Sequence, residues 1–220
     1  THGPALTNCA TALTEAVRSH APLVILAGDT PVSNPNHLQS IDQRELVKAT
    51  GAGFEQVRTT ETITKDVARA YYRAQVERRP IVLNMPADFM WQEVEHVATV
   101  LDVFTAPGGV AEGNVLDDAI GMIASARRPL ILAGAGAVSA KDSLIKLADR
   151  LEAPLATTLK AKGLFNDHPY NMDIFGTLST PAAYDIIAKS DCIVCFGSAL
   201  HSFTTDQGKL MRNRRVIQVD

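Results

Sequence analysis

Three side chains near the start of the chain could take part in chemistry. Imidazole titrates closest to neutral pH of all side chains, so His2 and His37 are candidate acid–base groups. Gln39 carries an amide that donates and accepts hydrogen bonds, so it could orient a reacting molecule. Loop histidines and glutamines more often only face solvent, and the alternative for each residue is a side chain without a function.

The segment around His2 has the composition of a turn that leads into a helix. Thr1-His2-Gly3-Pro4 is followed by an apolar pattern at helical spacing as far as residue 19. The first amides of a helix have no partner within it and lie at its positive end, so they attract anions. The amides of this turn could therefore lie near a bound anion, and a plain helix start is the alternative.

A second candidate site is a Gly-Ala-Gly turn between a predicted strand and a predicted helix. In this geometry the backbone amides of Gly134 and Gly136 could meet the diphosphate of a nucleotide. The third glycine of the dinucleotide fingerprint is absent, because Ser139 stands there. Further candidates at the ends of predicted elements are Gly176, Gly197 and Asp220. An acidic residue at a strand end can accept hydrogen bonds from a ribose.

The chain has three cysteines, which is an odd and sparse set that gives no disulfide framework. Cys192 and Cys195 have the spacing of a redox or zinc pair, but no second pair accompanies them and they lie within an apolar strand pattern. We expect two packed thiols and no metal site. Sparse cysteines are typical of a reducing compartment, which favours a cytoplasmic protein.

Composition excludes several classes of protein. Hydrophobic residues make up 46% of the 220 residues and charged residues 20%, as in chains that bury a core. The 21 Lys and Arg against 24 Asp and Glu give a net charge of −3, so neither nucleic acid nor a membrane is expected as a partner. The longest apolar runs fall far short of the roughly 18 residues typical of a membrane-spanning helix.

The order of strands and helices predicts two α/β domains. Helices are expected at 6–19, 41–50, 62–78, 115–126, 141–151 and 181–189. Strands are expected at 22–28, 54–58, 81–85, 129–133, 154–158, 192–196 and 215–219, the first of them covered on both faces. This alternation requires mainly parallel, doubly wound sheets. The stretch without periodicity at 91–112 should link the two domains.

Four segments of the first half resemble, in order, the pyrimidine-binding domain of a superfamily of thiamine diphosphate enzymes. These are the acetolactate synthase, pyruvate oxidase and benzoylformate decarboxylase relatives, which carry TxGPGxTN, PLxxxxG, FQExDQ and RPGPVxLxxPxD. The matching segments are 1–8, 22–28, 38–43 and 79–88, with departures at Ala5, Leu38 and Ser40. The resemblance implies that residues 1–90 are the C-terminal part of this domain. It also implies that Gln39 points toward cofactor and substrate, with Thr1, Gly3, Pro4 and Asn8 on the thiamine side.

The second half resembles the central domain of the same enzymes, which has a Rossmann-like fold. The matching runs are 127–137, 147–169 and 191–199. In relatives this domain holds FAD, ADP or no ligand. Flavin binders continue past the position of Gly197 with an arginine and acidic residues, which are absent here. FAD is therefore disfavoured, and residues 113–220 are expected to be a truncated central domain with an empty nucleotide-type fold.

The resemblance implies a fragment of a 2-oxo acid decarboxylase or carboligase whose intact parent uses thiamine diphosphate and Mg²⁺. The catalytic glutamate and the metal-binding segment of the family have no counterpart here, so this chain alone should bind no cofactor and be inactive. Active sites of the family form between subunits, which implies a homodimer or homotetramer for the parent. Two alternatives remain: a stand-alone Rossmann-type module that binds FAD or ADP, and an inactive scaffold fragment.

Overall fold

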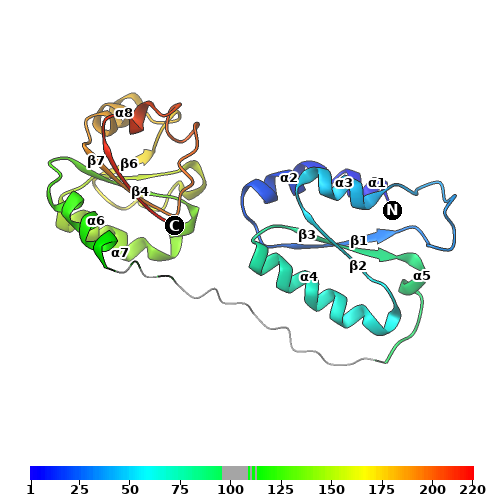
Figure 1. The fold of residues 1–220 in the computed structure, drawn as a ribbon. Helices are drawn as coiled ribbons and strands as arrows, with labels where there is room; N and C mark the ends of the chain where they lie inside the picture. Colours follow the sequence, from blue (N-terminus) through cyan, green and yellow to red (C-terminus); the bar gives the residue numbers. More distant parts are fainter. Residues whose placement is uncertain (96–108, 110, 112) are drawn as a thin grey trace. The chain divides into compact units, whose positions relative to one another are not determined.

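The computed structural model describes residues 1–95, 109, 111 and 113–220. The chain divides into two compact units, Thr1–Gly108 and Gly109–Asp220 (Figure 1). Each unit is a parallel sheet with helices on both faces, which confirms the predicted α/β class. The linker expected at 91–112 lies mostly outside the described residues. None of the described helices is long and apolar enough to cross a membrane.

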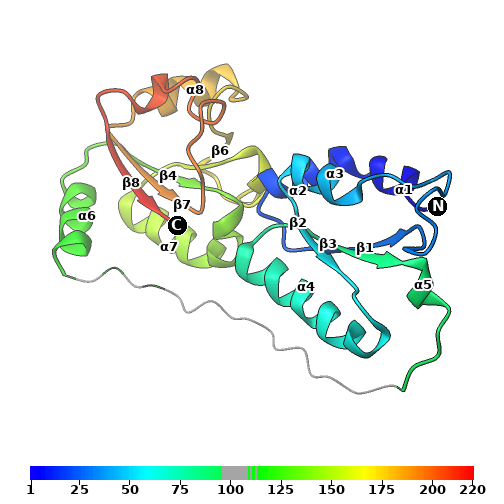
Figure 2. The same cartoon turned by 45° about the vertical axis from the view of Figure 1, so that its right-hand side comes forward.

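Unit 1 has a three-stranded parallel sheet in the order β1-β3-β2. The strands are β1 (Val24–Asp29), β2 (Gly53–Gln56) and β3 (Ile81–Pro86). The helices are α1 (Pro4–Thr7), α2 (Ala10–Arg18), α3 (Gln43–Thr50), α4 (Ile63–Glu77) and α5 (Ala87–Met90), with a 3₁₀ turn η1 (Thr60–Thr62) before α4. Helices α1, α2 and α3 cover one face of the sheet and α4 covers the other (Figures 1 and 2).

The central strand of unit 1, β3, is covered on both faces because its side chains are apolar on both. Ile81, Val82 and Leu83 are fully buried. Side chains alternate along a strand, so Val82 packs in the core with α2 and α3, whereas Ile81 and Leu83 pack with α4. Packing against helices on both faces holds β3 between β1 and β2.

Two predictions for unit 1 are wrong in detail. The sequence predicts one helix at 6–19, but the chain turns at Asn8 and Cys9 and forms α1 and α2 instead. It also predicts that the strand at 22–28 is covered on both faces, but Leu26 is 61% exposed. The reason is that β1 lies at the edge of the described sheet and pairs only with β3 there. An apolar run predicts a strand but not its place in the sheet.

Unit 2 has a five-stranded parallel sheet in the order β6-β5-β4-β7-β8. The strands are β4 (Pro129–Ala133), β5 (Leu155–Thr157), β6 (Asn171–Ile174), β7 (Cys192–Phe196) and β8 (Arg215–Val219). The helices are α6 (Asn114–Ala124), α7 (Lys141–Leu151) and α8 (Pro181–Ala188), with 3₁₀ turns η2 (Ala135–Ala140), η3 (Leu159–Ala161) and η4 (Lys209–Met211). Helix α8 covers one face, and α6 and α7 cover the other (Figure 2).

The core of unit 2 has a layer on each side of β4. Leu130 and Leu132 pack with Ile187 of α8, and Ile131 packs with Leu144 of α7. All five strands run in the same direction, so their carboxyl ends form one edge. This edge carries the glycines that the sequence assigns to a nucleotide.

Strand β6 has no counterpart in the sequence prediction. Its residues are all half-buried, and Asn and Asp are poor strand formers. Asp173 has a φ of 57°, and the pairing with β5 shifts register between Leu155 and Thr157. A polar, irregular edge strand has no apolar run by which to recognise it.

Candidate active site

Strands β1 and β3 of unit 1 end at the same edge of the sheet. They are parallel, with Gly28 opposite Met85 and Asp29 opposite Pro86. The segments that follow them therefore meet at one edge, which is where open α/β sheets bind ligands. We call residues 28–40 and 84–90 the carboxyl edge of unit 1.

The turn at the start of the chain lies against this edge. A Cβ on Gly3, whose φ is +51°, would collide with the carbonyl oxygen of Gln39. His2 lies beside the end of β1, since a Cβ on Gly28 would be 3.2 Å from its ring. The rings of His2 and His37 lie edge to face with their centroids 6.1 Å apart. The structure thus brings Gly3, both histidines and Gln39 together from distant parts of the sequence.

The other candidate residues of the opening segment face solvent. Thr1, Pro4 and Asn8 are exposed. Helix α1 spans only four residues, so few peptide dipoles add at its N-terminus. The contacts of Thr1, Gly3, Pro4 and Asn8 with the thiamine side of a cofactor stay predictions.

A hydrogen bond from the backbone N–H positions Gln39, and the structure describes none from its side chain. Its N–H donates to Nδ1 of His37 over 3.2 Å. The side chain is half-buried, and within the described residues its amide forms no hydrogen bond. The neighbouring Leu38 is 92% exposed. An amide in this state is able to bind another molecule, as the catalytic prediction for Gln39 requires, and that role stays a prediction.

Asp88 fixes the loop that leads to Gln39. Its carboxylate accepts hydrogen bonds from the N–H of Val32 (2.5 Å) and from the hydroxyl of Ser33 (2.7 Å). These bonds, with the Ser33 hydroxyl foremost, hold the pKa of Asp88 below its ordinary value. Sequence reasoning missed this role, because the motif that ends at Asp88 does not show which loop the carboxylate contacts.

A series of buried side-chain hydrogen bonds joins α3 to the carboxyl edge. Nε2 of Gln43 donates to Oδ1 of Asn84 (2.7 Å) and to the carbonyl of Gly28 (3.1 Å). Nδ2 of Asn84 donates to Oδ2 of Asp29 (2.7 Å), whose other oxygen accepts from the N–H of Thr30 (2.7 Å). Gln43 and Asn84 are each 2% exposed. The chain of bonds therefore orients the carboxylate of Asp29 at the end of β1.

Within the part of the chain that the structure describes, Oε1 of Gln43 is the one buried side-chain oxygen without a hydrogen-bond partner. A buried polar atom without a partner costs about 1–3 kcal/mol, so an added donor at this point would stabilise the edge. Sequence reasoning missed Gln43 and Asn84 as site residues. The available signal was an asparagine inside the otherwise apolar strand β3.

A hollow of about 390 Å³ lies beside the opening segment. It is lined by Thr1, His2, Ala5, Leu6, Cys9, Ile25, Leu26, Ala27 and Gly28. The last four belong to β1, so the hollow follows the unpaired side of this edge strand. Its lining includes no Arg or Lys side chain that could pair with a diphosphate.

In unit 2, the glycines assigned to a nucleotide site pack against one another. A Cβ on Gly134 would collide with the carbonyl of Gly197, and a Cβ on Gly197 would collide with the amide of Ala137. The N–H of Gly134 donates to the carbonyl of Phe196 (2.8 Å), and that of Gly136 donates to the carbonyl of Gly197 (3.1 Å). The amides that the sequence offers to a diphosphate are therefore already bonded within the fold.

Gly176 and Asp220 also lie at the carboxyl edge of unit 2. Gly176 follows β6 with a φ of +98°, and a Cβ there would collide with the carbonyl of Thr204. Asp220 follows β8 and is exposed. No contact among the described residues favours FAD or ADP at Gly134, Gly136, Gly176, Gly197 and Asp220. The predicted empty fold and the alternative, nucleotide binding at these residues, both stay open.

Cys192 and Cys195 are packed core thiols, as expected. They point to opposite faces of β7, Cys195 toward the core with α8 and Cys192 toward the core with α6. Burial raises the pKa of both thiols, that of Cys195 to about 11. Because they face opposite sides of the sheet, they do not form a pair that could hold one metal ion.

Comparison with known proteins gives the family. Residues 116–220 match the family model described as thiamine pyrophosphate enzyme, central domain. Over 99% of its length, the chain is 31% identical to the probable 2-ketoarginine decarboxylase AruI of Pseudomonas aeruginosa, of which it covers 40%. Over its whole length, it is 29% identical to the probable acetolactate synthase large subunit of Methanococcus aeolicus, of which it covers 39%. Residues 116–220 therefore belong to the thiamine pyrophosphate enzyme central domains.

A further relative shows the range of reactions in this family. The chain is 28% identical, over its whole length, to the sulfoacetaldehyde acetyltransferase of Rhodobacter capsulatus, of which it covers 38%. It thus spans about two fifths of the length of these thiamine pyrophosphate enzymes. The family model lies entirely within unit 2, which confirms the resemblance of the second half to the central domain.

The described residues fit only part of thiamine pyrophosphate, which is thiamine diphosphate under its other name. They contain no group of three or more His, Cys, Asp or Glu that could hold a metal ion, so they do not fit a Mg²⁺ diphosphate. The carboxylates of Asp29 and Asp88 at the carboxyl edge of unit 1 would repel a diphosphate as well. The uncharged, half-buried amide of Gln39 suits a neutral heteroaromatic ring, which needs hydrogen bonds but no counterion.

Proposed function

We propose that this chain forms part of a thiamine diphosphate enzyme that decarboxylates a 2-oxo acid or transfers the resulting fragment to an acceptor. The observation that carries the proposal is similarity over the entire chain to a probable 2-ketoarginine decarboxylase and to a probable acetolactate synthase. In this proposal, residues 1–90 belong to the pyrimidine-binding domain, 91–112 to a linker and 113–220 to the central domain.

The proposed role of unit 1 is to position the reactants at its carboxyl edge. When bound, the cofactor supplies an electron sink for the carbanion that is formed when a 2-oxo acid loses CO₂. Gln39 hydrogen bonds to the 2-oxo acid through its free side-chain amide. Asp88 holds the loop before Gln39, and the Gln43 to Asn84 hydrogen bond holds the strand ends beneath it.

The parent protein in this proposal brings Mg²⁺ and the diphosphate contacts from residues outside this chain. This follows from the absence of a metal cluster in the described residues and from the share of the relatives that the chain covers. By resemblance to the family, the parent is a homodimer or homotetramer that acts on a small 2-oxo acid. The sparse cysteines of this chain favour the cytoplasm.

The proposal is tested by measuring CO₂ release from pyruvate and from longer 2-oxo acids by the intact protein that contains this chain. We expect release that requires both thiamine diphosphate and Mg²⁺. Addition of an aldehyde or second 2-oxo acid then separates a carboligase, which forms a new carbon–carbon bond, from a simple decarboxylase. An intact protein that releases no CO₂ from any of them and binds no thiamine diphosphate contradicts the proposal.

A further inference from the structure

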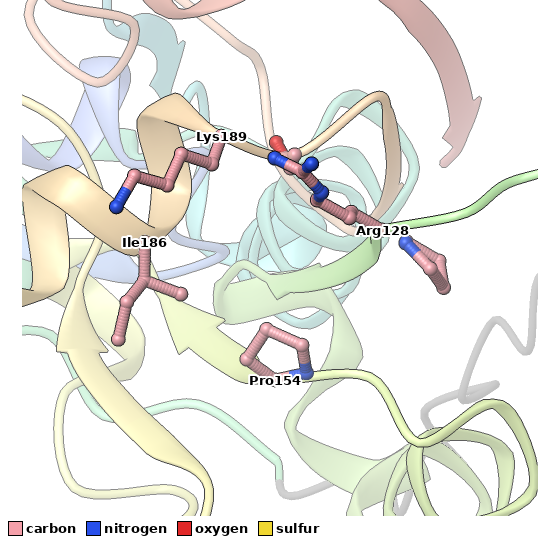
Figure 3. A pocket seen from close by; sticks show the side chains of 6 residues that line it. Arg128, Pro154, Ile186 and Lys189 are labelled. Atoms are coloured by element: carbon pink, nitrogen blue, oxygen red, sulfur yellow. The ribbon is translucent and has the colours of Figure 1, made fainter.

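A pocket of about 300 Å³ opens at the amino ends of β4 and β5 in unit 2, opposite to the carboxyl edge of that sheet. It is lined by Arg128, Pro129, Pro154, Ile186, Lys189 and Ser190 (Figure 3). Pro129 begins β4, and Pro154 directly precedes β5. The remaining wall comes from the last turn of α8 and the residues after it. All of the lining therefore belongs to unit 2, at or next to the ends of β4, β5 and α8.

The walls of this pocket are apolar and offer few hydrogen bonds. The rings of Pro129 and Pro154 have no N–H, and their conformational freedom is small. Ile186 forms another wall and is 45% exposed. The labelled side chains of Pro154 and Ile186 border the same open space in Figure 3. Pro129 is buried, so a molecule in this pocket would cover mainly Pro154 and Ile186. It needs an apolar body, because apolar contact is what releases water from these two residues.

Two cationic side chains border the apolar walls. Arg128 and Lys189 are exposed, and within the described residues neither side chain forms an ion pair. Asp185, one helical turn before Lys189, makes no ion pair with it. The pocket therefore combines an apolar surface with two positive charges that have no internal counterion.

The nearest carboxylate in sequence, Asp191, is already engaged. It accepts hydrogen bonds from the N–H groups of Arg127 and Arg128, both at 2.9 Å, and lies 3.5 Å from Nη2 of Arg215. The two backbone hydrogen bonds are the main reason that the pKa of Asp191 is lowered. Its carboxylate is thus engaged by other groups and forms no ion pair with the side chains of Arg128 and Lys189.

The negative end of α8 is also neutralised. Carbonyl oxygens at a helix C-terminus would repel an anion. Here the guanidinium of Arg214 donates to the carbonyl of Ala188 (2.7 Å), and the hydroxyl of Ser190 donates to the carbonyl of Ile187 (2.7 Å). An anion in the pocket would therefore not meet the carbonyls of Ile187 and Ala188 as free acceptors.

We propose that this pocket binds a small organic anion with an apolar body, of the class of aryl or short-chain carboxylates. The carboxylate pairs with Arg128 and Lys189, and the apolar part covers Pro154 and Ile186. The pocket volume of about 300 Å³ suits a small molecule, since ligand sites start at about this size. This site is independent of the carboxyl edge of unit 1 and of the function proposed for it.

The test is a titration of the isotope-labelled chain with benzoate, followed through its amide chemical shifts. We expect saturable shifts at the pocket residues in the millimolar range. Benzamide has the same apolar ring without the charge, and acetate has the charge without the ring. Because each lacks one of the two contacts, each should bind at least about threefold more weakly than benzoate.

Substitutions of the two cationic residues test where the anion binds. Arg128→Gln and Lys189→Gln should each weaken benzoate binding by about threefold, as expected for loss of one exposed ion pair. The fold should persist, because Arg128 bonds to Asp191 through its backbone N–H, which the substitution keeps. Lys146→Gln on α7, another exposed lysine, is the matched control and should leave the affinity unchanged.

Three outcomes overturn the proposal. The first is equal affinity for benzamide and benzoate, which would show that Arg128 and Lys189 do not contribute to binding. The second is unchanged benzoate affinity in both the Arg128→Gln and Lys189→Gln variants. The third is the absence of saturable shifts at the pocket residues.

Discussion

The carbonyl oxygen of Gln39 occupies the space in which any residue other than glycine at position 3 would carry its Cβ. Gly3 also has a φ of +51°, which L side chains rarely adopt. The opening turn and the loop of Gln39, which are distant in sequence, can therefore pack together only while residue 3 is glycine.

Gly3→Ala should lower the free energy of unfolding of unit 1 by about 2 kcal/mol, because it adds strain at a positive φ and a steric clash. Chemical denaturation of the chain, followed by a probe in unit 1, measures this loss. Gly121→Ala in α6 is the control, since a Cβ there meets nothing within 4 Å and alanine favours the helix. A Gly3→Ala variant whose unit 1 unfolds at the same denaturant concentration as in the wild type would show that the opening turn and the loop of Gln39 are not in contact.

The bond between Gln43 and Asn84 should contribute to stability. Gln43→Leu removes the unpaired Oε1 but leaves two acceptors, Oδ1 of the buried Asn84 and the carbonyl of Gly28, without this donor. We therefore expect a net loss of about 1 kcal/mol in the free energy of unfolding. The control is Lys48→Leu, at an exposed position of the same helix. This change should alter the free energy of unfolding by less than about 0.5 kcal/mol.

A double-mutant cycle separates this bond from general effects of substitution. Gln43→Leu combined with Asn84→Leu should be less damaging than the sum of the two single changes, with a coupling of about 1 kcal/mol. Strict additivity of the two changes would mean that the bond between these amides does not stabilise unit 1.

Much of the fold follows from the apolar pattern of the sequence. The bounds of β4, α7, β7 and β8 agree with the prediction, because each is a sharply limited run of apolar or helix-periodic residues. Strand β6 could not be predicted, because it is held by its pairing with β5 rather than by its own composition. Local sequence carries no sign of a pairing of that kind.

The candidate site was predictable only in outline. The resemblance places Gln39 and Gly3 around one cofactor, and the structure brings both to one edge of unit 1. The partners of Asp88 and Gln43 could not be assigned, because both bond to residues that the fold brings near from other segments. The packing of Gly134 against Gly197 could not be predicted for the same reason, since the sequence shows the glycines but not the residues that contact them.

Cys192 and Cys195 should resist thiol reagents in the folded chain, whereas the half-exposed Cys9 should react. Burial raises the pKa of both core thiols, that of Cys195 to about 11, so neither is a thiolate at neutral pH. Stability that comes from keeping these thiols neutral is complete below the ordinary thiol pKa and is lost as the pH rises through about 11. Labelling with a disulfide reagent at neutral pH should modify one cysteine in the native chain and all three in denaturant.

The 220-residue chain should bind neither thiamine diphosphate nor Mg²⁺ with useful affinity. Its described residues provide no metal cluster, and a diphosphate without a metal or cations lacks its counterions. Calorimetric titration with thiamine diphosphate, in the presence and absence of Mg²⁺, measures this. The intact protein serves as the positive control, and submillimolar, Mg²⁺-dependent binding to the chain alone would contradict the expectation.

The turnover number of the intact protein with Gln39 changed to alanine tests the central claim most directly. If the Gln39 side chain orients the reacting 2-oxo acid, Gln39→Ala should lower kcat by roughly 30-fold, or about 2 kcal/mol, with little change in KM or in melting temperature. Gln56→Ala, on the neighbouring strand β2, is the matched control and should be kinetically silent. A Gln39→Ala enzyme that keeps kcat within about twofold of the parent, or one that fails to fold, would contradict a direct role for Gln39 in the reaction.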